Sequence, residues 1–134
     1  MKIEKIVYNG KIVATIIRNN VNVNNTIFFT PPNYPLQLGL LIHKKGEVIK
    51  AHVHKKIKRI VTTTQEVLYF KNGKARVYFY DNKGKDIKSS ILKKGDIVLF
   101  ATGGHGLKML ENTEIIEVKQ GPYFGVDEDK IRFK

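Results

Sequence analysis

The chain contains no cysteine among its 134 residues. This absence excludes disulfide bonds, thiolate catalysis and cysteine-ligated zinc sites. No apolar run approaches the roughly 18 residues that a membrane-spanning helix needs. The first ten residues, MKIEKIVYNG, lack the pattern of a signal peptide. We therefore expect a single domain with one core, located in the cytoplasm and without a membrane partner.

Acidic residues are scarce, with 12 Asp and Glu against 24 Lys and Arg, so the formal net charge is +12. Such a charge favours anionic partners, among them phosphorylated metabolites and nucleic acid. The lysines are spread along the whole chain, and we find neither a helix-turn-helix pattern nor an aromatic RNA-binding motif. We therefore expect a small anionic metabolite and consider nucleic acid unlikely. A lysine-rich surface with no function is the simplest alternative.

No convincing helical period is present, whereas short stretches of alternating polar and apolar residues recur along the chain. Asn9-Gly10 and Asn72-Gly73 separate such stretches, and this dipeptide is the favoured two-residue turn of a β-hairpin. The pattern predicts an all-β protein, an antiparallel barrel or sandwich. The predicted strands cover residues 2–8, 11–17, 26–30, 36–43, 48–54, 57–64, 66–70, 74–80, 87–92, 97–101, 107–110 and 114–120.

Two histidines, His52 and His54, share one predicted strand. Alternate residues of a strand point to the same face, so these side chains are neighbours about 7 Å apart. They can bind one metal ion together, or they can be polar residues of an exposed face. His43 ends the preceding strand beside a Lys-Lys-Gly turn, where a surface position is expected.

The glycines and the glutamate around this histidine pair form a spacing pattern. Gly46, His52, His54, Glu66 and Gly73 follow the pattern G-x5-H-x-H … E-x6-G. This pattern resembles the first signature of the cupin family. A later stretch, GDIVLFATGGHG (residues 95–106), resembles the second cupin signature, which contains one further histidine. The resemblance implies an antiparallel jelly-roll barrel, the double-stranded β-helix, over about residues 36–118. A hairpin at 2–17 would precede this barrel, and a tail at 121–134 would follow it.

The cupin resemblance also implies one divalent transition metal, such as Fe, Mn, Ni or Zn, in the barrel mouth. Carried over to this chain, the ligands would be His52, His54, Glu66 and His105. Imidazole and carboxylate ligands suit several such ions. Eleven residues separate His54 from Glu66, where the family usually has three or four. This longer connection leaves Gln65 as an alternative ligand to Glu66.

Four further residues are candidates for the chemistry of such a site. Tyr34, in the proline-rich loop FFTPPNYP, can reach into the barrel mouth or pack within its loop. Glu117 is either a general base facing the mouth or an outward charge. Arg59 suits a substrate carboxylate or phosphate, although a surface strand residue is equally ordinary. Gly104 would let the backbone approach a substrate closely.

The whole chain resembles uncharacterised cupins associated with sugar-nucleotide and surface-polysaccharide biosynthesis. This resemblance suggests a metal-dependent isomerase, epimerase or oxygenase that acts on a sugar or sugar phosphate. One alternative is a metal-free sugar-nucleotide isomerase in which His52 and His54 act as acid and base. Another is a non-enzymatic module that binds a metabolite or nucleic acid. Because open sheet edges need covering, we also expect a homodimer.

Overall fold

The computed structural model describes residues 2–133, and its regular secondary structure is almost entirely antiparallel strand. The elements are β1 (Ile3–Tyr8), β2 (Lys11–Ile17), β3 (Ile27–Phe28), β4 (Gly39–Leu40), β5 (Glu66–Asn72), β6 (Lys74–Tyr80), β7 (Asp86–Lys93), β8 (Ile97–Phe100), β9 (Gly104–Met109), β10 (Glu114–Lys119) and the short helix α1 (Val126–Asp129). The all-β prediction is therefore confirmed. No helix in this part of the chain is long and apolar enough to span a membrane.

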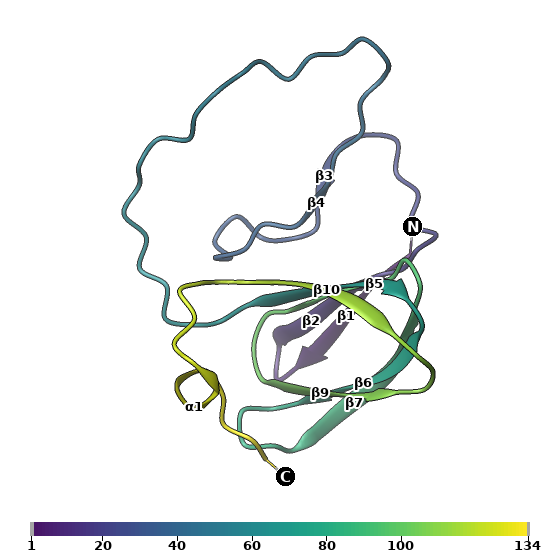
Figure 1. Cartoon of the computed structure of the whole chain (residues 1–134), viewed down its shortest axis with the longest axis vertical. Helices are drawn as coiled ribbons and strands as arrows, with labels where there is room; N and C mark the ends of the chain where they lie inside the picture. Colours follow the sequence, from purple (N-terminus) through teal and green to yellow (C-terminus); the bar gives the residue numbers. More distant parts are fainter. Residues whose placement is uncertain (1, 134) are drawn as a thin grey trace.

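Two sheets face each other across one core (Figure 1). Of these two, the larger sheet has the strand order β1-β2-β8-β5-β10, and the smaller has the order β7-β6-β9. Strands β3 and β4 form a separate two-stranded sheet. The sequence pattern predicts a barrel or a sandwich, and the cupin resemblance implies a barrel, whereas the strands of residues 2–133 form open sheets with free edges. The N-terminal hairpin is part of the larger sheet, because β2 pairs with β8.

Alternation explains how the smaller sheet forms its half of the core. Along β6, Ala75, Val77 and Phe79 are buried, while the residues between them are only partly buried. Alternate side chains of a strand point to opposite faces, so one face of β6 is apolar and packs inward. Phe79 meets Phe100 of the opposite sheet with 6.0 Å between ring centroids.

The two Asn-Gly turns lie where the sequence predicts them. Asn9 and Gly10 have φ values of 51° and 73° and connect β1 to β2. Positive φ at both central residues is what a type I′ hairpin turn requires. Gly73, with φ of 91°, lies between β5 and β6.

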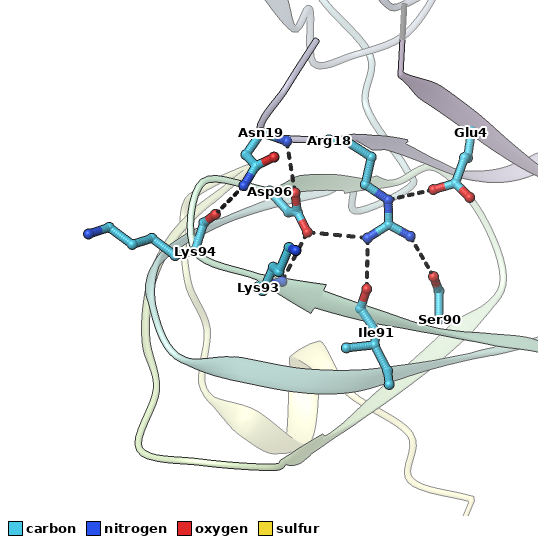
Figure 2. Close-up of polar contacts among 8 residues, drawn as sticks. All are labelled: Glu4, Arg18, Asn19, Ser90, Ile91, Lys93, Lys94 and Asp96. Carbon is cyan, nitrogen blue, oxygen red and sulfur yellow. Dashed lines mark hydrogen bonds and ion pairs between the residues drawn. The ribbon is translucent and has the colours of Figure 1, made fainter.

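A polar network ties the end of β2 to the turn between β7 and β8 (Figure 2). The buried carboxylate of Asp96 accepts hydrogen bonds from Arg18 Nη1 at 3.2 Å, from the Asn19 backbone N–H at 2.8 Å and from the Lys93 backbone N–H at 2.9 Å. Arg18 also donates to the backbone carbonyl of Ile91 at 2.7 Å. The network therefore joins the larger sheet to β7 of the smaller sheet.

One long segment lies apart from both sheets. Residues 43–64, here called the arm, form a wide loop that arches away from the sheets between β4 and β5 (Figure 1). The sequence predicts strands at 48–54 and 57–64, and the structure contradicts this prediction, because the arm contains no strand. The physical reason is that no other backbone segment lies alongside it, and a strand needs a neighbour to bond its N–H and C=O groups.

Candidate functional site

A cavity of about 920 Å³ opens between the two sheets. Its lining comes from two edge strands, β9 and β10, together with the start of β5 and the C-terminal tail. The lining includes Glu66, Leu68, Gly104, His105, Ile115, Glu117, Lys130, Arg132 and Phe133. Apolar side chains thus form the floor, and ionisable groups lie above them.

Glu66 and His105 lie next to each other in this cavity. Oε1 of Glu66 is 3.7 Å from Nε2 of His105, and their side chains are 12% and 29% exposed. Glu66 begins β5 on the face that also holds buried Leu68, as the sequence predicts. The imidazole of His105 stacks on Phe100, with ring centroids 3.7 Å apart and planes inclined by 8°. This stacking fixes the ring plane and directs one ring edge toward the carboxylate.

Glu117 faces the same cavity, so the structure favours the inward of its two predicted orientations. It lies opposite Leu68 in the register of β10 with β5, and opposite residues of antiparallel strands share a face. A hydrogen bond with Glu66 and burial together raise the pKa of Glu117 above its ordinary value. The two carboxyl groups therefore form a pair in which Glu117 holds a proton more readily.

Glu66 has the opposite shift. Burial by itself would raise the pKa of Glu66, but its polar contacts with His105 and Glu117 and the nearby charges of His105 and Lys119 outweigh burial, so the pKa is lowered. A carboxylate that stays ionised beside a neutral or protonated partner is suited to accept a proton or to bind a cation. This arrangement separates the roles of two carboxyl groups in one cavity.

Gln65 is not an alternative to Glu66 in this structure. It is buried on the other face of the chain, where its side-chain oxygen accepts a hydrogen bond from the Leu36 backbone N–H at 3.4 Å. Its own backbone N–H donates to Gln120 Oε1 at 2.5 Å. Gln65 therefore fixes the point where the arm joins β5, while Glu66 lines the cavity.

His52 and His54 lie on the arm and are exposed to solvent. Their ring centroids are 5.2 Å apart, so they are neighbours as predicted. The Nδ1 atom of His52 is 2.7 Å from the Lys50 carbonyl oxygen. Of the four predicted ligands, the structure brings together Glu66 and His105 as one pair and His52 and His54 as another. Within residues 2–133, no three His, Asp or Glu side chains of a single chain form a metal-binding group.

The remaining candidates have different positions. Gly104 lies on β9 and lines the cavity, where a Cβ atom would collide with the ring of Phe133. Tyr34 lies in the loop between β3 and β4 rather than among the lining residues, and burial raises its pKa. Arg59 is exposed on the arm, away from the cavity.

The sequence analysis missed the basic groups at the cavity. Lys119 Nζ lies 3.7 Å from Glu117 Oε2 and 3.5 Å from Asp129 Oδ2. Lys130 and Arg132 of the tail also line the cavity. A signal for Lys119 was present, because it is two residues after Glu117 and so shares its face of β10. No comparable signal existed for the tail, whose path only the fold shows.

Comparison with known proteins gives no relative. No family model matches the chain, and no curated protein or solved structure matches it either.

Proposed function

We propose that this protein is a metal-binding cupin that acts as an enzyme on a small polar anion such as a sugar phosphate or sugar nucleotide. The observation that supports this proposal most strongly is the Glu66–His105 pair, 3.7 Å apart in a cavity lined by two sheets. Two predicted ligands that are 39 residues apart in the sequence are neighbours in the fold. The cupin form of the fold is part of this proposal.

The pair fits a divalent transition metal by its chemistry. A carboxylate oxygen and an imidazole nitrogen are ordinary ligands of Zn, Fe, Mn and Ni. Each ligand atom lies about 2.0–2.2 Å from a bound zinc ion, so two ligands of one ion can be up to about 4.4 Å apart. The observed 3.7 Å is within that limit. When bound, such an ion would polarise a carbonyl or hydroxyl group as a Lewis acid.

The other residues of the cavity suit an anionic substrate that gains and loses protons. Lys130 and Arg132 add positive charge to the lining, and the net charge of +12 attracts anions over a longer range. Glu117, with its raised pKa, lies next to Glu66 and can exchange a proton with a substrate carbon or hydroxyl. Isomerisation or epimerisation of a sugar requires a base and an acid of this kind.

A second candidate is a metal-free isomerase, which the contact between Glu66 and Glu117 favours. In this reaction the two carboxyl groups would be base and acid, in place of the predicted His52 and His54. The two candidates differ in one result, because activity of a metal-free isomerase survives chelation.

Metal analysis of the untagged protein tests the first candidate. We expect about one transition metal per chain in the wild type, and loss of that metal in a Glu66→Gln/His105→Ala variant. His43→Ala is the matched control, since it removes an exposed histidine whose Nδ1 pairs with Glu47 far from the cavity. Circular dichroism should show that each variant is folded. If the wild type binds neither Fe, Mn, Ni nor Zn when these are added, the metal proposal is wrong and the metal-free isomerase becomes the better candidate.

A further inference from the structure

The arm exposes an apolar surface that a lone chain leaves in water. Val48, Val53 and Ile60 are 81%, 88% and 83% exposed, and every residue from 43 to 64 is exposed. Apolar side chains at this density are typical of a segment that packs against a partner. A loop that stays in water would not need such apolar side chains.

The backbone of the arm also lacks partners. From Val48 to Thr64, no N–H or C=O group bonds to another backbone group of residues 2–133. Nevertheless, residues 48–54 alternate as a strand does, with Lys50, His52 and His54 on one face. This segment therefore has the sequence of a strand and no neighbour to pair with.

The two sheets have free strand edges with which such a segment could pair. In the described part of the chain, β9 pairs only with β6, and β10 pairs only with β5. Both free edges line the cavity that holds Glu66 and His105. A free edge is a row of unpaired N–H and C=O groups that accepts another strand. The cavity is therefore bounded by two strand edges that a further strand could extend.

Segment 48–54 fits the free edge of β9 in length and in face. It has seven residues, and β9 has six. His105 points inward from β9, since it lies opposite buried Phe79 of β6. Adjacent strands are about 4.8 Å apart, so a strand added to β9 with its histidines inward would place them beside His105.

We propose that segment 48–54 pairs with β9 of a second copy of the chain, and that the two copies exchange arms reciprocally. The exchange would place His52 and His54 of one chain beside Glu66 and His105 of the other. Each metal site would then be built from two chains, so this part of the inference rests on the proposed metal-binding function. Reciprocal exchange of one element is a common route to a two-fold symmetric dimer.

The connections at both ends of the arm favour a second copy over the same chain. At its start, Ile42 is bonded to Thr26, with the backbone N–H of Ile42 donating to Thr26 Oγ1 at 2.9 Å. At its end, Gln65 is bonded to Gln120. Between these fixed points the arm extends away from its own cavity (Figure 1). The eleven residues 55–65 span at most about 40 Å when extended, which is enough to reach a neighbouring molecule.

A complementation experiment tests the shared site. One variant has a defective arm, His52→Ala/His54→Ala, and the other has a defective cavity, Glu66→Gln/His105→Ala. Each variant alone should bind no metal. After the two are unfolded and refolded together, random pairing should restore about a quarter of the wild-type metal per chain, because each mixed dimer contains one intact site. If the mixture stays metal-free while the wild type binds metal, the arm closes on its own chain and the exchange is wrong.

A crosslinking experiment tests the exchange without metal. Because the chain has no cysteine, single thiols can be introduced cleanly. Val53→Cys in one tagged chain and Lys108→Cys in a differently tagged chain place one thiol on the arm and one on the exposed face of β9. A short bifunctional thiol reagent should join the two different chains. Val53→Cys with Lys5→Cys, on the exposed part of β1, is the control pair and should not be joined.

The two experiments separate the two proposals. Crosslinking between chains in a protein that binds no metal would support the exchange and refute the metal site. The opposite result is a protein that binds metal, is a monomer by light scattering and shows no crosslinking above the control pair. That result would overturn the exchange and leave the metal site in place.

Discussion

Replacing Asp96 with alanine should destabilise the protein more than any change at an exposed ion pair. The carboxylate of Asp96 is buried and accepts three hydrogen bonds, one of them from the guanidinium of Arg18 (Figure 2). Removing it leaves two backbone N–H groups, of Asn19 and Lys93, without their acceptor. It also leaves the charge of Arg18 without its buried partner.

The expected cost follows from these contacts. Removing one partner of a buried ion pair costs about 3–5 kcal/mol. The side chain of Arg18 is 23% exposed and keeps its contact with Glu4 at 2.7 Å, which partly compensates its charge. We therefore expect the lower end, about 3 kcal/mol. Asp96→Asn should cost less, since one side-chain oxygen can still accept hydrogen bonds.

Urea unfolding followed by circular dichroism measures this difference as a shift in the free energy of unfolding. Glu4→Ala is the matched control, because it removes the other carboxylate on Arg18 from a position whose side chain is 48% exposed. Exposed ion pairs contribute about 0–1 kcal/mol. If Asp96→Ala costs no more than Glu4→Ala, the network does not hold the two sheets together and the reasoning from burial is refuted.

Two further predictions concern turns. Gly103→Ala should destabilise by about 2–3 kcal/mol, because φ is +75° and a Cβ would collide with a backbone carbonyl oxygen; Gly10→Ala, with φ of +73° and open space around it, should cost only about 1 kcal/mol in the same urea assay. Equal destabilisation by the two substitutions would show that the structure relieves the collision at Gly103. In carbon-detected NMR, the pKa of Asp81 should lie below the ordinary value of an aspartate, because hydrogen bonds from the backbone N–H groups of Lys85 and Lys83 lower it. Stability from this group should be present above its unfolded pKa and lost as pH falls through the lower folded pKa; a pKa at or above the ordinary value would contradict these bonds.

Local pattern was sufficient wherever neighbours in sequence are also neighbours in space. Asn9-Gly10 predicted its hairpin turn, because few residues other than asparagine and glycine tolerate positive φ. The shared face of Glu66, Leu68 and Phe70 also followed from the period of two, and the structure confirms that Glu66 points into the cavity.

The sequence pattern did not predict features that depend on which distant segments of the chain contact each other. Residues 48–54 alternate like a strand, but in this structure no strand lies beside them, so the predicted strand is absent. The orientation of Glu117 depended on the register of β10 with β5, which its own sequence leaves open between two faces. Tyr34 was placed near the site by its loop alone, and the fold puts that loop elsewhere.

The all-β class and the Asn-Gly turns could be predicted without the tertiary structure, because they follow from side-chain alternation and from the φ values that asparagine and glycine allow. The sequence also excluded every chemistry that needs a thiol. Only the tertiary structure decided that Glu66, His105 and Glu117 share one cavity, and that Asp96 is a buried structural carboxylate. It also decided that His52 and His54 lie on an arm outside the sheets. The physical reason is that contacts between distant segments depend on the pairing order and register of strands, which alternation within one strand does not encode.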